Sequence, residues 1–397
     1  MAVKNRTNEI IKVLEGNEAA AYGAMLCRPD VICAYPITPQ TSLLEYLFQF
    51  KADGLLKAEM VAVEGEHSAM SSVIGAAKAG GRTFTSTSSQ GLAFMYEPYI
   101  DASTGRLPIV MVIATREMQS PLGVASSEQD AIMARDGGWI MINVESCQEI
   151  LDGIIMAYRL GENPDILLPV NVCYDGFYLS YLSEPVSLPS QEQVERFLPP
   201  FKPSTRLDPQ VPMTNPYCVG ELPVKYRYGH LAAMQRAKTK LEEIEREFHS
   251  IFGRSYGGQI EEYRCEDADI VLITMGSCVG TARVVVDKKR EEGLRVGLIK
   301  IRMFRPFPKE RIMNAVKGKK AVGLIDRNVC FGWGSGTIFI ELKAALFDSD
   351  TRMPLLNFIA GLSGLDITVQ HIERAINAIH LAAQGEPYQE VTWLDLE

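Results

Sequence analysis

Ala34-Tyr-Pro-Ile-Thr-Pro-Gln-Thr41 is the stretch of sequence on which the fold assignment depends. The apolar residues 31–34 predict a β-strand that leads into it. Pro36 and Pro39 then end any strand pairing, because proline has no N–H group to donate. Apolar residues recur at helical spacing over 41–50, so we expect a strand, a rigid elbow and a helix.

The elbow carries polar groups at a place where ligands commonly bind. Thr38, Gln40 and Thr41 contribute hydroxyl groups and an amide. In an open α/β sheet, ligands bind at the carboxyl ends of the strands, which is where this elbow is expected to lie. An ordinary loop between a strand and a helix accounts for the same residues, so composition alone leaves both interpretations open.

Strands and helices alternate along most of the chain, and each expected strand is a nearly continuous apolar run. This pattern is typical of a parallel sheet covered by helices on both faces. We therefore predict an α/β protein with two doubly wound parallel-sheet domains, at residues 1–183 and 261–397. Residues 184–260 should form a linker and a long helix, because nine prolines fall within 184–223 and 231–252 is amphipathic. Few strands or helices can be recognised in the proline-rich part.

Composition and charge exclude several classes of partner. The chain of 397 residues is 47% apolar and 22% charged, which is ordinary for a globular protein. Its net charge of −9 argues against nucleic acid or an anionic membrane as a partner. No apolar run approaches the ~18 residues of a transmembrane helix, and no signal peptide is recognisable after Met1. We therefore expect a cytoplasmic protein.

The eight cysteines predict neither a metal site nor a disulfide framework. No two are spaced as C-x-x-C, and several lie in apolar runs, where a thiol behaves as a small apolar group. His67, alone near an expected helix start, is interpreted as a packing or capping residue. Gly332-x-Gly334-x-Gly336 lacks the spacing of a phosphate-binding loop. If this protein transfers electrons, we expect the carriers to lie on another chain.

Glu64 stands between the apolar residues 60–63 and an expected helix of small residues. If this position is shielded from water, desolvation raises the pKa of the carboxyl group. The alternative is a surface carboxylate that the helix dipole stabilises. The neighbouring residues alone do not decide between these two interpretations.

Six motifs are informative as a set. They are Tyr35-Pro-Ile-Thr-Pro-Gln-Thr41, Val63-Glu64-x-Glu66-x-Ser68-Ala69-Met70, Thr85-x-Thr87-Ser-Ser-Gln-Gly91, Arg302-x-Phe304-Arg-Pro-Phe307, Asp326-Arg-Asn328 and Phe358-Ile-Ala-Gly-Leu-x-Gly364. In order and spacing, over residues 10–375, the chain resembles the α subunit of 2-oxoacid:ferredoxin oxidoreductases of the pyruvate:ferredoxin oxidoreductase type. The resemblance implies a domain at 1–183 that binds the pyrimidine of thiamine diphosphate. It also implies a transketolase C-terminal-like domain at 261–397.

The same resemblance implies thiamine diphosphate as the cofactor and assigns roles to individual residues. Glu64 matches the family's catalytic glutamate, which hydrogen-bonds N1′ of the pyrimidine and favours the imino tautomer that deprotonates the thiazolium C2. Thr38 and Arg116 match positions that hold the substrate carboxylate, a role suited to an arginine fork. The motifs also imply a set of cofactor-binding residues, namely Tyr35, Pro36, Ile37, Ser89 and Gln90.

An assembly is implied as well. A partner β subunit would supply the ligands of the diphosphate and of Mg²⁺ and would carry a [4Fe–4S] cluster. This agrees with the lack of a thiamine-type metal motif and of a cysteine cluster in this sequence. Ferredoxin-like γ and δ subunits, ferredoxin as acceptor and a dimer of heteromers complete the expectation. A non-catalytic scaffold subunit is the non-enzyme alternative, against which the presence of Glu64 and Arg116 argues.

The segment after Arg116 departs from the family pattern. Pyruvate enzymes of the family have apolar and aromatic residues between the arginine and an aspartate, whereas here polar residues lead to Asp130. The residues that replace the apolar cover are Gln119, Ser120, Ser126 and Ser127. A polar pocket favours a small substrate with a second carboxylate, so this segment favours oxalate, split to CO₂ without coenzyme A as in oxalate oxidoreductase. Pyruvate or another 2-oxoacid, converted to an acyl-coenzyme A, is the alternative.

Overall fold

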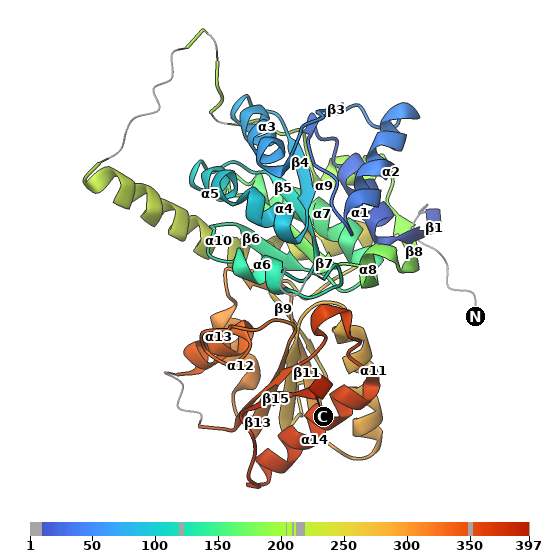
Figure 1. Ribbon diagram of the computed structural model, residues 1–397, viewed down its shortest axis with the longest axis vertical. Helices are drawn as coiled ribbons and strands as arrows, with labels where there is room; N and C mark the ends of the chain where they lie inside the picture. Colours follow the sequence, from blue (N-terminus) through green and yellow to red (C-terminus); the bar gives the residue numbers. More distant parts are fainter. Residues whose placement is uncertain are drawn as a thin grey trace.

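Two α/β domains, each built around its own sheet, lie one above the other in Figure 1. The structure, a computed structural model, describes residues 10–118, 123–203, 205–208, 210–211, 219–347 and 352–396. The N-terminal domain is drawn from blue to green and the C-terminal domain from orange to red. The predicted α/β class with two sheet domains is therefore confirmed.

The N-terminal domain contains a seven-stranded sheet with the order β12-β6-β7-β5-β4-β2-β3. Its strands are β2 (Val31–Ile32), β3 (Glu59–Met60), β4 (Thr83–Thr87), β5 (Val110–Thr115), β6 (Ile140–Asn143), β7 (Val170–Asp175) and β12 (Met303–Arg305). All pairs are parallel except β12 with β6, which is antiparallel. Every residue of β5 and β7 is buried, as expected for strands covered on both faces.

Helices cover both faces of this sheet. They are α1 (Gly16–Leu26), α2 (Thr41–Ala52), α3 (Glu66–Lys78), α4 (Ser89–Phe94), α5 (Tyr96–Thr104), α6 (Gln129–Met133), α7 (Cys147–Gly161) and α8 (Tyr178–Tyr181). The small residues of α1 allow close packing on α7, since a Cβ atom at Gly23 would lie 3.0 Å from the carbonyl oxygen of Leu151. Almost all of α7 is buried as a result.

The connection between the domains contains more regular structure than the sequence predicts. β8 (Ser183–Leu188) pairs antiparallel with β1 (Ile10–Glu15), and α9 (Gln191–Phe197) follows. The expectation of few strands or helices here is therefore wrong, because β1, about 170 residues away in sequence, supplies the pairing partner.

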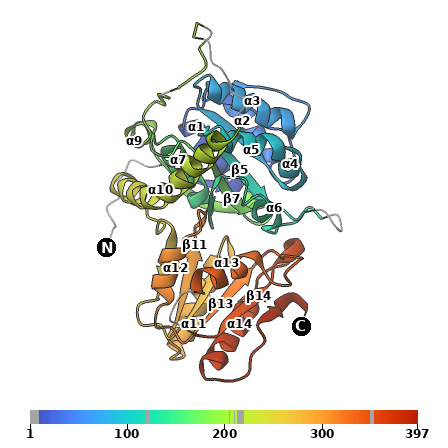
Figure 2. The same cartoon turned by 90° about the vertical axis from the view of Figure 1, so that its left-hand side faces the viewer.

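The long helix α10 (Glu221–Phe252) begins ten residues earlier than predicted. Pro223 is compatible with this start, because the N–H groups of a first helical turn have no partner within the helix. Figure 2 shows α10 crossing the N-terminal domain over α7. Within the part of the chain that the structure describes, no helix is both long and apolar enough to cross a membrane.

The C-terminal domain contains a six-stranded sheet with the order β15-β14-β13-β10-β11-β9. Its strands are β9 (Ile260–Tyr263), β10 (Ile270–Thr274), β11 (Val296–Ile301), β13 (Ala321–Asp326), β14 (Leu355–Ile359) and β15 (Val391–Trp393). Only β9 runs antiparallel to its neighbour. The helical segments are α11 (Cys278–Glu291), α12 (Lys309–Val316), α13 (Thr337–Leu346), α14 (Val369–Ala383) and the short 3₁₀ turns η1 (Leu362–Gly364) and η2 (Leu394–Leu396).

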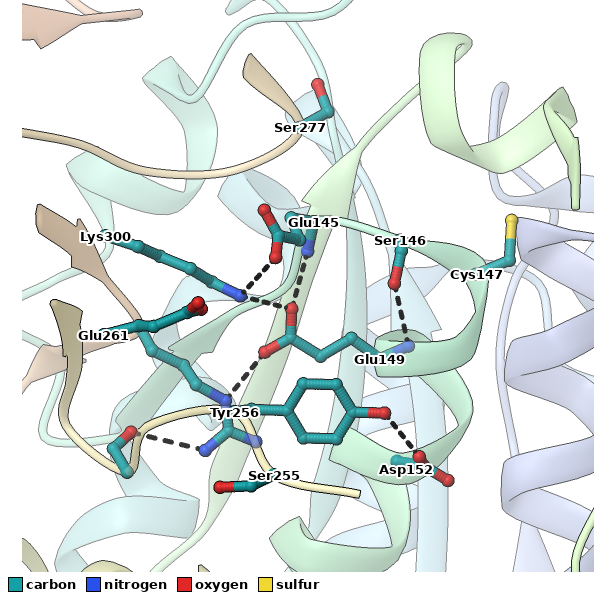
Figure 3. A network of polar contacts seen from close by, with 12 residues as sticks. Glu145, Ser146, Cys147, Glu149, Asp152, Ser255, Tyr256, Glu261, Ser277 and Lys300 are labelled. Carbon is teal, nitrogen blue, oxygen red and sulfur yellow. Dashed lines mark hydrogen bonds and ion pairs between the residues drawn. The ribbon is translucent and has the colours of Figure 1, made fainter. Parts of the chain in front are cut away.

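A buried ion network joins the two domains and α10 (Figure 3). Glu149 on α7 accepts hydrogen bonds from Lys300 Nζ at 2.6 Å and from Arg302 Nε at 2.8 Å. Arg302 also pairs with Glu245 of α10 at 3.2 Å, and Lys300 with Glu145 at 3.1 Å. Arg302 lies where the chain leaves the C-terminal sheet after β11 and joins the N-terminal sheet as β12. The Arg302 motif is therefore structural.

Candidate active site

The proline elbow lies between β2 and α2, as predicted, and buried polar side chains hold it. The Gln40 side-chain amide donates to Ser86 Oγ, and its oxygen accepts from the Ile37 N–H at 3.4 Å. Asn17 Nδ2 donates to the Pro39 carbonyl at 2.7 Å, and the Tyr174 hydroxyl donates to Asn17 Oδ1 at 2.5 Å. These buried partners fix the direction in which the elbow leaves the sheet.

Arg116 follows β5 and reaches the elbow. Its Nη1 donates to the carbonyl oxygen of Thr38 at 2.9 Å, and its Nε to that of Gly123 at 3.2 Å. The structure thus brings Thr38 and Arg116 together, although through the backbone of Thr38. Only 6% of Arg116 is exposed, and among the described residues it forms no ion pair with a carboxylate. A largely buried guanidinium group whose hydrogen bonds go to neutral carbonyls is available to bind an anion.

The carboxyl group of Asp130 holds the backbone of Arg116. Its Oδ2 accepts the N–H of Ser89 at 2.8 Å and that of Arg116 at 3.0 Å, and its Oδ1 accepts the N–H of Ala131 at 2.7 Å. Burial raises the pKa of Asp130 to about 7, although these backbone hydrogen bonds oppose the shift. The sequence contained a signal for this role, since Asp130 ends the segment that follows Arg116.

Of the two cofactor-binding candidates of α4, Ser89 is linked to Arg116 through Asp130. Ser89 is fully buried at the start of α4, and its hydroxyl donates to the Glu117 carbonyl at 2.7 Å. Its φ of 45° lies in the left-handed region, which is unfavourable for a side chain, and the bond to Asp130 holds it there. Gln90 is half-buried.

Glu64 is exposed, at the start of the segment that leads into α3. Ser68 Oγ donates to Glu64 Oε1 at 2.5 Å, and this hydrogen bond lowers the pKa of Glu64. Of the two interpretations that the sequence left open, the structure of this chain agrees with the surface carboxylate and not with a shielded carboxyl group of raised pKa, because β3 ends at Met60. Burial instead raises the pKa of Glu66, in the first turn of α3. Here the carboxylate of Glu64 is thus ionised at neutral pH.

The remaining elbow candidates share an open face with Glu64. Tyr35 is 37% exposed, Pro36 and Thr38 are exposed, and Ile37 is half-buried. Phe94, at the end of α4, is exposed and adjoins Gly65, the neighbour of Glu64. Apart from Ser89 and Gln90, the residues assigned to the cofactor therefore lie on a surface with apolar character.

Of the four residues expected to form a polar substrate pocket, the structure describes two. Ser126 and Ser127 are buried, and Gln119 and Ser120 lie outside the described residues. Ser126 Oγ contacts Asp175 Oδ1 at 3.5 Å and accepts from Arg327 at 3.4 Å. Ser127 Oγ accepts the backbone N–H of Gln129 at the start of α6, so both serine hydroxyls have partners other than Arg116.

A cavity of about 550 Å³ lies behind these serines, between the two domains. Ser126, Tyr178, Ser277, Arg327 and Gly364 contribute to its lining. Glu64 and Arg116 are not among the described residues that line it. The cavity is therefore separate from the open face that carries Glu64.

The glycine loop before α13 has a structural explanation. Asp326, at the end of β13, is buried and accepts hydrogen bonds from the backbone N–H of Ile338 at 3.1 Å and from Asn357 Nδ2 at 2.9 Å. Burial raises its pKa to about 7. A Cβ atom at Gly336 would lie 2.0 Å from this carboxyl group, so the close approach requires glycine.

Metal-binding groups do not cluster in the described residues. No group of three or more histidine, cysteine, aspartate or glutamate side chains there could hold a metal ion. The seven described cysteines are free thiols, and six of them are buried.

The sequence of this chain matches known protein families and full-length relatives. Residues 22–246 match the family described as "Pyruvate flavodoxin/ferredoxin oxidoreductase, thiamine diP-bdg", and residues 268–372 match "Pyruvate:ferredoxin oxidoreductase core domain II". Pyruvate synthase subunit PorA of Methanothermobacter thermautotrophicus is 46% identical over 389 residues, 98% of this chain and 99% of that protein. NADH-dependent phenylglyoxylate dehydrogenase subunit alpha of Aromatoleum evansii is 42% identical, covering 100% of this chain and 97% of that one.

A solved structure shares the fold. The 2-oxoglutarate:ferredoxin oxidoreductase of Magnetococcus marinus superposes with a TM-score of 0.70 at 21% identity over 95% of this chain, which spans 66% of that one. Both family matches and the full-length relatives agree with the six motifs of the sequence. The chain belongs to the thiamine-diphosphate-dependent 2-oxoacid:ferredoxin oxidoreductase family, as an α subunit.

Proposed function

We propose that this chain forms part of a complex that oxidatively decarboxylates pyruvate or a closely related 2-oxoacid. The observation that carries the proposal is Arg116, a buried guanidinium whose described partners are the neutral carbonyls of Thr38 and Gly123. This cation lies at the carboxyl edge of the sheet that also carries Glu64 and the elbow. A guanidinium group is well suited to binding one carboxylate through two parallel hydrogen bonds.

Two observations favour pyruvate or another 2-oxoacid over oxalate as the substrate. The oxalate interpretation rested on a polar pocket, and the hydroxyls of Ser126 and Ser127 are directed toward other partners. Pyruvate synthase and phenylglyoxylate dehydrogenase, by their names, act on 2-oxoacids with one carboxylate. We therefore propose a 2-oxoacid substrate with coenzyme A as acyl acceptor.

The open face fits one half of a site for thiamine diphosphate. Once protonated, the carboxyl group of Glu64 can donate a hydrogen bond to N1′ of a pyrimidine ring, and Ile37 and Phe94 provide apolar surface for the ring. When bound, thiamine diphosphate supplies the nucleophilic carbon and the electron sink of the reaction. Glu64 would bind and orient the pyrimidine, and Arg116 would hold the substrate carboxylate.

The other half of the site must come from a partner. We propose that a β subunit with diphosphate and Mg²⁺ ligands and a [4Fe–4S] cluster covers the exposed face around Glu64. Ferredoxin-like γ and δ subunits would then pass electrons to ferredoxin, in a dimer of heteromers. Covering the face would bury Glu64 and raise its pKa toward the value of a proton-transferring group.

A substrate panel tests this function. The complex purified with its partner subunits is assayed by reduction of a viologen dye with pyruvate, phenylglyoxylate, 2-oxoglutarate and oxalate, each with and without coenzyme A. We expect the highest kcat/KM for a monocarboxylic 2-oxoacid, dependent on coenzyme A, and no turnover by the α chain alone. Faster turnover of oxalate without coenzyme A would restore the oxalate interpretation, and no turnover of any substrate would favour a scaffold.

Replacing Arg116 with lysine is expected to lower kcat/KM for the 2-oxoacid by about 10–100-fold, mainly by raising KM. Lysine keeps the charge but cannot hold Thr38, Gly123 and a substrate carboxylate from one planar fork. The loss of one hydrogen bond to a charged group costs about 1.5–3 kcal/mol, and ~1.4 kcal/mol is tenfold. Steady-state kinetics of the complex measure this effect.

Arg106→Lys is the matched control for this substitution. Arg106 precedes β5, at the opposite end of the strand from Arg116, and also donates to two backbone carbonyls, those of Leu167 and Ile166. Its replacement should affect stability without changing KM. Equal KM changes in the two variants would contradict the role given to Arg116.

A further inference from the structure

The segment that follows Arg116 is in contact with the C-terminal domain at two places. Glu117 Oε2 accepts the backbone N–H of Ser363 at 3.2 Å. Farther along, the carbonyl oxygen of Ser126 accepts the N–H of Gly364 at 2.9 Å. Gly364 has φ of 78°, and a Cβ atom there would lie 2.5 Å from the Cβ of Ala125. The turn η1 therefore packs closely on the segment.

The start of α6 is attached to the loop after β13. The Glu128 N–H donates to the Arg327 carbonyl at 3.0 Å. Gln129 forms two hydrogen bonds to one residue: its Oε1 accepts the Val329 N–H at 2.9 Å, and its Nε2 donates to the Val329 carbonyl at 3.2 Å. Gln129 is buried, so these bonds are shielded from water. Figure 2 shows α6 on the side of its domain that faces the C-terminal domain.

The same turn of α6 holds Arg116. Asp130, the residue after Gln129, accepts the backbone N–H groups of Arg116 and Ser89. The Glu117 N–H in turn donates to the Ala125 carbonyl at 2.9 Å. Arg116 is thus connected to Val329 through two adjacent residues of one short, buried helix.

We propose that the C-terminal domain positions the substrate-binding arginine, with Gln129 as the positioning residue that transmits the constraint. The C-terminal domain contributes none of the candidate site residues, yet its backbone groups at 327–329 and 363–364 fix the segment on which Arg116 lies. The side chain of Gln129 hydrogen-bonds Val329 and not the elbow, so it acts through its neighbour Asp130. This inference rests on the proposed function, since it concerns how Arg116 meets a 2-oxoacid.

A positioning role predicts a loss of substrate affinity without a loss of fold. Small displacements of a charged anchor lower catalytic efficiency strongly, by about 10²-fold for 1 Å. Gln129→Ala removes both bonds to Val329, and we expect a rise in KM of about tenfold or more. Gln129→Glu keeps an oxygen for the Val329 N–H but loses the donor, so its KM should lie between those of wild type and Gln129→Ala.

Gln148→Ala is a closely matched control. Gln148 on α7 also clamps one backbone residue with its amide, accepting the Ser187 N–H at 2.7 Å and donating to the Ser187 carbonyl at 3.1 Å. This clamp ties β8 to α7 and does not involve the Arg116 segment. It therefore reports the cost of losing such a clamp at a site without a positioning role.

The experiment compares these variants in the assembled complex by kinetics with the 2-oxoacid and by hydrogen exchange of the peptide over residues 123–131. We expect Gln129→Ala to raise KM and to increase exchange in this peptide, whereas Gln148→Ala does neither. An unchanged KM, or unchanged exchange, in Gln129→Ala overturns the inference. The exchange readout does not depend on turnover, so a wild-type complex inactive on every 2-oxoacid would overturn the proposed function separately.

Discussion

Replacing Glu64 with glutamine is expected to lower kcat of the assembled complex by about 10²–10⁴-fold, the range for a positioned acid–base group. Glutamine has nearly the same shape, but its amide cannot exchange a proton with a ring nitrogen. The exposed position of Glu64 means that no packing in this chain depends on its charge, apart from the hydrogen bond from Ser68. The loss should therefore appear in the rate and not in thermal stability.

Stopped-flow reduction of the partner's iron–sulfur cluster under saturating 2-oxoacid measures this change. Glu97→Gln is the control, because Glu97 is also an exposed carboxylate near a helix start, in the first turn of α5. It should leave kcat unchanged. Near-wild-type turnover by Glu64→Gln would show that Glu64 is only a helix-end carboxylate.

Glu149→Gln is expected to lower the free energy of unfolding by about 3–5 kcal/mol, since it removes the carboxylate that two buried cations share and leaves each of them a single, longer ion pair. Although burial alone raises the pKa of Glu149, Lys300 and Arg302 together hold it below its usual range. The carboxylate of Glu149 in the network of Figure 3 is therefore ionised in the folded protein. Its stabilisation is present above the unfolded-state pKa of a glutamate and is lost as pH falls through the lower folded-state value.

Urea unfolding at neutral pH, followed by tryptophan fluorescence, measures the loss. Glu373→Gln provides the contrast, because the Lys288–Glu373 pair lies at the surface, with 55% and 23% of the two side chains exposed. Such a pair contributes about 0–1 kcal/mol. Similar losses in both variants would mean that the buried network does not hold the domains together.

The fold was predictable where the decisive information was local. The proline elbow, the buried runs of β5 and β7 and the alternation of strands and helices each lie within a few dozen residues. β1 and β8 were missed because each is a strand only through its pairing with the other, far along the chain. Pro223 masked the start of α10, because a proline in the first turn resembles a helix break.

In the candidate site, too, local motifs were predictable and contacts between distant segments were not. The proximity of Thr38 and Arg116 followed from motifs, but the exposure of Glu64 depended on where β3 ends, which composition did not reveal. Gln129 was missed as a positioning residue because its partner, the backbone of Val329, lies 200 residues away in sequence. The sequence shows that Ser126 is polar but does not show which group its hydroxyl contacts. The contact with Asp175 could therefore not be predicted.

The pairing of β12 with β6 has a consequence for synthesis on the ribosome. Met303 and Arg305 pair with Ile142 and Met141, so the N-terminal sheet is complete only when residue 305 has left the ribosome. At ~5–20 residues per second, residues 184–305 take about 6–24 s to make. During that time β6 is a bare, apolar edge strand, the kind of surface on which nascent chains aggregate.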